Sequence, residues 1–179
     1  MNAPVVESER IRLRGHRADD LDACAAMWAD PDVTRFIGGK PSTRDETWSR
    51  LLRYAGSWSM LGYGYWLAEE RTTGRLIGEV GFGNWQRDIK PALDVPEMGW
   101  ALLPWAQGKG LATEGVMAGL KWSDANFVEA TVTCIISPEN APSIRVAEKC
   151  GFREHARTLF KGDPTIIFRR LGSGGRRTA

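Results

Sequence analysis

Two hydrophobic periodicities alternate along the chain, and together they predict its secondary structure. Residues 10–15 (RIRLRG) alternate apolar and basic side chains, which is typical of a strand. Apolar residues from Leu21 to Trp28 recur at helical spacing, and Pro31 is expected to end that helix. A second helix is predicted after Ser42-Thr43, with an apolar stripe made of Trp48, Leu51, Leu52, Ala55 and Trp58.

The rest of the chain is predicted to alternate between strands and helices. Strands are expected at 63–70, 75–85, 95–104 and 128–136, and a closing hairpin at 156–160 and 165–171. Helices are expected over 112–127 and from Ser143, as the cap, to Cys150. The order β-αα-βββ-α-β-α-ββ predicts an α/β fold with a mixed, mostly antiparallel sheet and helices on both faces. Strand 128–136 is expected to lie parallel to 95–104, because a helical crossover joins them.

Composition narrows the class of protein. The 179 residues, 42 % of them hydrophobic, suit one domain, which we place at 8–171 with a flexible tail at 172–179. The net charge is +2, and no basic stripe indicates nucleic-acid binding. Cys24, Cys134 and Cys150 lie in apolar surroundings and are expected to be buried free thiols. No signal pattern or membrane-length apolar run is present, so we expect a soluble, cytoplasmic protein without membrane contact.

The segment Gln107-Gly108-Lys109-Gly110 carries the clearest chemical signal. A P-loop would need Ser or Thr after the lysine, and a dinucleotide-binding turn would need glycine at Thr113. The remaining readings are a plain glycine-rich turn before a helix and a nest of backbone N–H groups that binds a pyrophosphate at the helix N-terminus. The segment by itself does not decide between these two readings.

Two motifs resemble those of the GNAT superfamily of N-acetyltransferases. QGKGLA matches the acyl-CoA signature Q/R-x-x-G-x-G/A through Gln107, Gly110 and Ala112. NAPSIRVAEKCGF, which runs from Asn140 to Phe152, resembles the later Asn-x-x-Ala/Ser…Gly-Phe segment, and most of all that of the RimJ/RimL-type branch, which acetylates ribosomal-protein N-termini. The resemblance extends to the order of elements over residues 8–171.

The resemblance implies the GNAT fold and acetyl-CoA as cosubstrate. No metal is expected, because no Cys/His spacing suggests a zinc site and Asp19-Asp20 is explained by the start of a helix. The pantetheine arm would pair with the backbone of the strand before the glycine loop. The residues that this resemblance assigns to acyl-CoA are Ala101, Leu102, Leu103, Gln107, Gly108, Lys109, Gly110, Leu111, Ala112, Thr113, Asn140 and Ser143.

Acetyl transfer to an amine needs a base, and Glu97 is the candidate. It lies ten residues before Gln107, and a cleft lined by Trp100 and Trp66 would raise its pKa. An exposed or hydrogen-bonded structural role for Glu97 stays open, and Glu79 is the competing carboxylate. The family's proton-donating tyrosine falls on Ala147, so Ser143 is the candidate partner of the thiolate, besides its role as a helix cap.

The predicted function is an acetyl-CoA-dependent N-acetyltransferase in which an amine attacks directly within a ternary complex. The acceptor would be a protein N-terminus or a small amine. The alternative is an acyl-CoA-binding module without catalysis. His16 and His155 are expected to have packing or solvated roles, and an edge strand near the C-terminus could pair two subunits in a homodimer.

Overall fold

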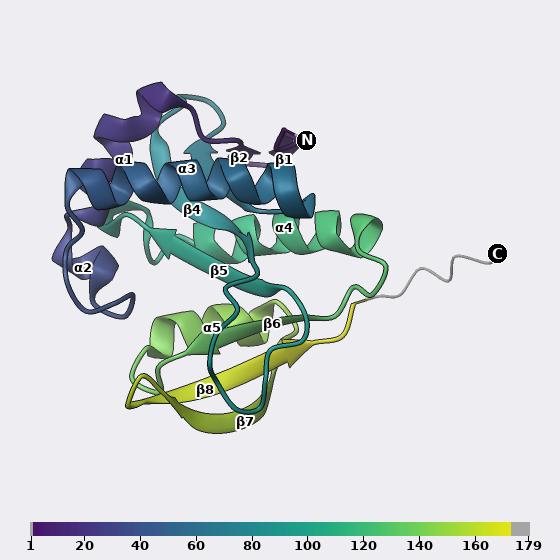
Figure 1. The fold of residues 1–179 in the computed structure, drawn as a ribbon. Coiled ribbons are helices and arrows are strands. Elements are labelled where there is room, and N and C mark those ends of the chain that lie inside the picture. Colours follow the sequence, from purple (N-terminus) through teal and green to yellow (C-terminus); the bar gives the residue numbers. More distant parts are fainter. Residues whose placement is uncertain (1, 173–179) are drawn as a thin grey trace.

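The computed structural model describes residues 2–172 and forms one layered α/β unit (Figure 1). The strands of this part are β1 Val6–Glu7, β2 Ile11–Arg14, β3 Tyr65–Glu70, β4 Leu76–Gly83, β5 Glu97–Leu102, β6 Val132–Ile136, β7 Arg153–Phe160 and β8 Asp163–Arg170. The α-helices are α1 Leu21–Trp28, α2 Pro31–Thr34, α3 Arg44–Leu61, α4 Leu111–Asn126 and α5 Ala141–Lys149.

All eight strands form one sheet in the order β1-β2-β3-β4-β5-β6-β8-β7. Neighbouring strands are antiparallel except β5 and β6, which are parallel and are joined through α4. The predicted fold class, including the parallel position of the strand after the crossover helix, is therefore confirmed.

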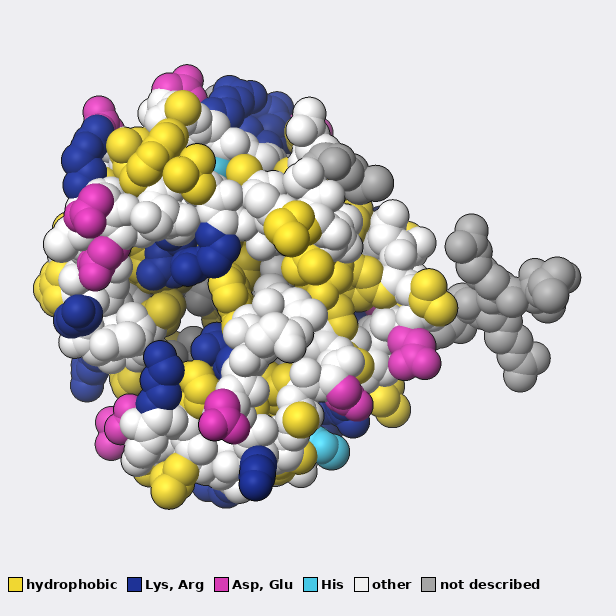
Figure 2. Space-filling model, in the orientation of Figure 1, with side chains coloured by type: hydrophobic (Ala, Val, Ile, Leu, Met, Phe, Trp, Pro, Cys, Tyr) yellow, Lys and Arg dark blue, Asp and Glu magenta, His cyan; other side chains and the backbone are white. Residues whose placement is uncertain are grey.

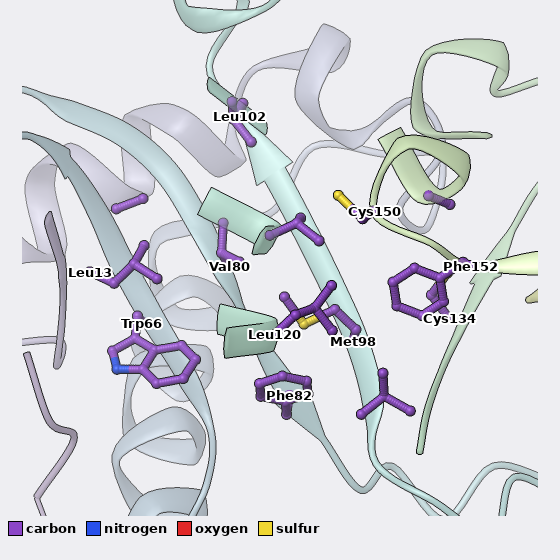
Figure 3. Close-up of a cluster of buried hydrophobic side chains, with 14 of the residues drawn as sticks. Leu13, Trp66, Val80, Phe82, Met98, Leu102, Leu120, Cys134, Cys150 and Phe152 are labelled. Carbon is purple, nitrogen blue, oxygen red and sulfur yellow. The ribbon is translucent and has the colours of Figure 1, made fainter. Parts of the chain in front are cut away.

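Helices cover both faces of the sheet because strand side chains alternate between them. On one face, Leu67 and Ala101 pack against α1 and α3. On the other face, which holds the larger core, Trp66, Val80 and Met98 pack beneath α4. Figure 3 shows that this core continues across the sheet from Leu13 on β2 to Cys134 on β6 and to Phe152.

Several helix and strand ends differ from their prediction for local reasons. Pro31 begins a short helix rather than ending α1: the Asp30 side chain accepts the Asp32 N–H and caps α2, which suits proline at the first helical position. Asn140 rather than Ser143 caps α5, by accepting the Ser143 N–H at 3.2 Å. The predicted strand at 128–136 begins only at Val132, and Val128 is fully exposed.

The two ends of the domain also differ from the prediction. Strand β1 pairs with β2 and lies before the predicted boundary at residue 8. Gly172 packs so closely against Ala130 that a Cβ there would lie 2.1 Å from the Ala130 Cβ, and the rest of the predicted flexible tail lies outside the described residues. The three cysteines are free and buried, as expected. Over residues 2–172, no helix combines the length and the apolar character needed to cross a membrane.

Candidate functional site

The parallel strands β5 and β6 are paired only at one end, and this opens the sheet. Glu97 opposite Thr133 is their single register pair, and the Thr133 N–H donates to the Pro96 carbonyl at 3.0 Å. Beyond Glu97, β5 stays paired with β4 as far as Leu102 opposite Gly78, while it leaves β6 (Figure 1). One edge of β5 is therefore open in the middle of the sheet, as is required if an extended ligand is to pair with it.

Backbone alternation decides which residues of β5 face this opening. The Leu103 N–H donates to the Ile77 carbonyl on β4 at 2.9 Å. Because backbone groups alternate sides along a strand, Ala101 also faces β4, whereas Trp100 and Leu102 face the opening. Of the three strand residues predicted to bind the cosubstrate through their backbone, only Leu102 is placed to do so. Sequence reasoning did not single out the backbone of Trp100.

The glycine loop after β5 presents unpaired backbone donors. Gly108 and Gly110 have φ values of +72° and +78°, a region that favours glycine. Gly110 is also the N-cap of α4, and no side chain caps this helix. Within the described chain, the N–H groups from Gly108 to Thr113, which include Lys109, Leu111 and Ala112, donate to no acceptor. This is the geometry of an anion-binding nest that continues into a helix N-terminus.

Gln107 and Lys109 are exposed, but their side chains make contacts within the chain. The Gln107 side-chain amide donates to the Leu102 carbonyl at 2.9 Å, so it fastens the loop to the end of β5. The Lys109 ammonium lies 5.2 Å from the centroid of the Trp105 ring. Both side chains therefore contact residues that lie just before the loop.

A brace that sequence reasoning missed holds the glycine loop from behind. Glu114, in the first turn of α4, accepts hydrogen bonds from the Ser8 hydroxyl and from the backbone and side chain of Arg10. Arg10 also donates to the Lys109 carbonyl at 3.0 Å. Burial alone would raise the pKa of the Glu114 carboxyl, but these hydrogen bonds hold the pKa below its usual value. The partners lie about a hundred residues apart in sequence, so no local pattern indicates them.

Glu97, the predicted base, lies where β5 leaves β6 and is bound to Arg87. Arg87 Nε and Nη2 donate to its two carboxylate oxygens at 2.6 and 2.8 Å. The expected lining by Trp66 and Trp100 is wrong: Trp66, Val80 and Trp100 lie in register on the opposite face of the sheet. The surroundings of Glu97 are thus ionic rather than apolar.

Glu79, the competing carboxylate, is fully buried on the same face as Glu97. Its Oε1 accepts from Trp28 Nε1 at 3.2 Å and lies 3.3 Å from His16 Nε2, while its Oε2 has no partner. Burial alone would raise the pKa of Glu79, but the contacts with His16 and Trp28 outweigh it and lower the pKa. Ligand atoms of His16, Cys24 and Glu79 lie within 4.8 Å of one another, which is the closest grouping suited to a metal in the described chain. The His16 side chain is buried, which agrees with the predicted packing role and not with the solvated one.

Tyr65 is a further candidate that sequence reasoning missed. A Cβ on Gly99 would lie 2.0 Å from the Tyr65 hydroxyl, so the ring crosses Gly81 and Gly99 towards the opening. Burial, and then the charge of Glu97, raises the pKa of Tyr65, so its hydroxyl stays protonated at neutral pH. Glycines at facing positions of neighbouring strands were the available signal, because they often mark the close approach of another group.

Helix α5 carries the remaining predicted residues. The Asn140 side chain is engaged as the helix cap, whereas the Ser143 hydroxyl has no hydrogen-bond partner within residues 2–172. Ala147 is completely buried in the core between α5 and the sheet. The position of the family tyrosine therefore offers no proton donor, and Ser143 is the free hydroxyl of this helix.

Comparisons with known proteins concern the family and the fold of this chain. A model of the acetyltransferase (GNAT) domain matches residues 10–153. An uncharacterized protein of Bacillus subtilis (strain 168), YkkB, is 30 % identical over 95 % of this chain and 98 % of its own length. A structure from Bordetella pertussis, assigned to the GNAT-family acetyltransferases, is 30 % identical with a TM-score of 0.83, over 94 % of this chain and 99 % of that one.

A structure of RimL, a ribosomal L7/L12 α-N-protein acetyltransferase in complex with coenzyme A, shares the fold at 14 % identity. Its TM-score is 0.78, over 96 % of this chain and 100 % of that one. The open strand edge, the glycine loop and the extent of the domain match thus lead to one conclusion: this chain belongs to the GNAT family of N-acetyltransferases.

Proposed function

We propose that the protein transfers the acetyl group of acetyl-CoA directly to a primary amine while both substrates are bound. The observation that carries this proposal is the series of unpaired N–H groups from Gly108 to Thr113, directly beyond the open edge of β5. Such donors suit a pyrophosphate, and the exposed edge suits the amide-containing pantetheine arm. The residues present therefore fit coenzyme A.

Each part of the site has a chemical role in this proposal. The N–H groups of the loop bind the pyrophosphate, and the backbone of Trp100 and Leu102 pairs with the pantetheine arm. A backbone N–H at Leu102 would meet the developing oxyanion. The Ser143 hydroxyl would donate to the departing thiolate, while Asn140 orients the start of α5.

Glu97 is the proposed general base for the amine. Its ion pair with Arg87 keeps the carboxylate in place, and its position at the point where β5 and β6 separate puts it beside the opening. The protonated hydroxyl of Tyr65, on the same face, can donate a hydrogen bond to a group bound above Gly99. Both side chains lie on the face of α1 and α3, so we expect the acceptor to enter from that side.

The chemical identity of the acceptor amine is a second part of the proposal. The motif from Asn140 to Phe152 resembles that of the RimJ/RimL-type branch, and both a protein N-terminus and a small amine are candidate acceptors. The catalytically silent acyl-CoA-binding module also stays under test, because Ala147 supplies no proton donor and Glu97 is engaged by Arg87.

A thiol-release assay with acetyl-CoA and a panel of N-terminal peptides and small amines tests the proposal. For Glu97→Gln we expect kcat to fall by about 100-fold or more, the usual contribution of a general base, with little change in KM for acetyl-CoA. Glu154→Gln is the matched control, because Glu154 also forms a two-bond pair with an arginine, Arg157, but on an exposed hairpin. Tight binding of coenzyme A without thiol release for any amine would establish the silent module instead.

A further inference from the structure

A row of aromatic rings covers the sheet beside Glu97 on the face of α1 and α3. Tyr54 stacks on Tyr65 with ring centroids 4.6 Å apart, and Tyr65 lies 5.8 Å from Trp85. A Cβ on Gly83 would lie 2.3 Å from the Trp85 indole, so this ring packs directly against the strand at Gly83. The rings form an apolar floor that leads to the proposed base.

Arginine side chains surround this floor. The Arg53 and Arg87 guanidinium carbons lie 5.2 and 5.9 Å from the centroid of the Trp85 ring, and that of Arg50 lies 3.8 Å from the Trp28 ring. Lys161 and Arg87 both lie near the ring of Phe160, at the tip of the β7–β8 hairpin. Figure 2 shows Lys and Arg side chains at the rim of a hollow between α3 and this hairpin.

We call the arginines around this floor, Arg50, Arg53 and Arg87, the arginine wall. The positive charges of this wall exceed the negative charges beside it. Glu97 is bound to Arg87, and Glu79 lies beneath the wall with His16 and Trp28. Within residues 2–172, Arg50 and Arg53 form no ion pair with a carboxylate. Arg50 donates to the Tyr54 hydroxyl at 3.4 Å and its charge helps to lower the pKa of Glu79, but neither arginine is paired with a carboxylate, so both can still bind an anion.

Unpaired donors point to the same kind of ligand. Arg50 Nε and Trp85 Nε1 are buried and have no hydrogen-bond acceptor. Buried polar groups normally have a hydrogen-bond partner, which a ligand or a water can supply. A guanidinium that is stacked on an aromatic ring, with N–H groups still free, is suited to a carboxylate or a phosphate.

We infer that the acceptor is a small primary amine that carries an anionic group, a carboxylate or a phosphate, which Arg50 and Arg53 bind while the amine faces Glu97. This inference rests on the proposed function and names the acceptor class for the same site. Polyamines and other polycationic amines are disfavoured, because juxtaposed like charges at a binding surface raise the free energy of association.

Matched pairs of amines test the inference in the thiol-release assay. One arm compares O-phosphoethanolamine with ethanolamine, the other compares α-amino acids with their primary amides, and spermidine represents the polycations. We expect the anionic member of at least one pair to have a kcat/KM at least 10-fold above its neutral partner. The two arms distinguish a phosphate from a carboxylate.

Arg53→Gln tests the wall itself, because Arg53 is exposed on α3 and its loss is compatible with folding. We expect KM for the preferred anionic amine to rise at least 10-fold, with KM for acetyl-CoA unchanged within twofold, and Arg53→Glu to lower the preference further. Arg44→Gln is the matched control, since Arg44 lies at the start of the same helix and pairs with Asp22, an exposed residue. Arg50→Gln should act like Arg53→Gln.

The outcomes separate this inference from the proposed function. Equal or faster acetylation of the neutral amines or of spermidine would overturn the inference and leave the transferase activity standing. If no amine releases thiol, quenching of tryptophan fluorescence by O-phosphoethanolamine or an amino acid decides. Quenching in the wild-type protein that is lost in Arg53→Gln would support the anion site without the activity. If the wild-type protein shows no quenching either, both the anion site and the transferase activity are overturned.

Discussion

The site depends on a few residues whose backbone or side chain leaves a group unpaired. Gly108 and Gly110 hold left-handed backbone conformations, so the N–H groups of the loop turn to one side and find no acceptor in the described chain. Ser143 leaves its hydroxyl free, whereas Asn140 uses its side chain as a cap. Residue type alone did not distinguish these two roles, because Ser and Asn are both good caps.

Replacement of Gly110 tests the loop at this scale. Gly110→Val places a β-branched side chain at φ +78°, which costs about 1–2 kcal/mol and turns the N–H groups away from a common ligand. We expect the Kd for coenzyme A, measured by calorimetry, to rise at least 10-fold.

Gly62→Val is the matched control for Gly110→Val. Gly62 ends α3 with φ +75°, and a Cβ there meets nothing within 4 Å. Gly62→Val should lower the free energy of unfolding by a similar amount but leave the Kd for coenzyme A within about twofold. Unchanged affinity in Gly110→Val would contradict the nest.

At the scale of elements, a largely buried ionic cluster connects β2, β3 and the residue before α1. Arg14 on β2 forms two hydrogen bonds with Asp20 and one with Glu69 on β3. Asp20 also accepts the Arg17 N–H. Burial alone would raise the pKa of Asp20, but Arg14 and the backbone bond outweigh it, so the pKa is lowered.

Asp20→Asn should therefore destabilise the fold in a pH-dependent way. A carboxyl whose pKa is lower in the folded state stabilises it above the unfolded pKa of about 4, and this contribution disappears as the pH falls through the folded value. In urea unfolding, we expect a loss of about 1–3 kcal/mol at pH 7 that shrinks below about pH 4.

Asp22→Asn is the control for this pH dependence. Asp22 pairs with Arg44 at the surface, where its side chain is 84 % exposed, and such pairs contribute at most about 1 kcal/mol. A loss in Asp20→Asn that stayed constant down to pH 3 would show that the charge of Asp20 does not carry the effect.

At the scale of the whole molecule, the sheet has two parts, β1 to β5 and β6 to β8, which separate where β5 leaves β6. The core beneath α4 and α5 spans both parts, from Trp66 to Cys134, so the opening does not divide the domain (Figure 3). A ligand that pairs with β5 in the opening would contact both parts. Strand β7 is one of the two edge strands of the sheet, and pairing of two subunits through it stays a prediction.

Coenzyme A should therefore stabilise the entire fold. A ligand present at 100 times its Kd adds about 2.7 kcal/mol, which for a domain of this size raises Tm by about 5–10 °C. Differential scanning fluorimetry measures this shift, and Gly110→Val should show a much smaller one. A Tm that does not respond to coenzyme A in the wild-type protein would count against the opening as the binding site.

The sequence by itself determined the fold class, the position of the glycine loop and the order of the longer elements, but not the short strand β1 or the short helix α2. These features follow from local patterns: side-chain periodicity distinguishes strands from helices, and glycines mark the turn after β5. The GNAT signature in Gln107, Gly110 and Ala112 is equally local. Local caps were less certain, because Asn140 and Ser143 are three residues apart and either one could begin α5.

Only the tertiary structure decided the surroundings of the reacting groups. The pairing of Glu97 with Arg87, the brace from Arg10 to Glu114 and the path of Tyr65 across Gly99 all depend on how separate elements pack. Strand register placed Trp66 on the face opposite Glu97, and a shift by one residue would have reversed this. Trp100 lies on that opposite face for a local reason, because it follows Glu97 by three residues on the same strand. Such contacts depend on the path of the whole chain, which no short stretch of sequence specifies.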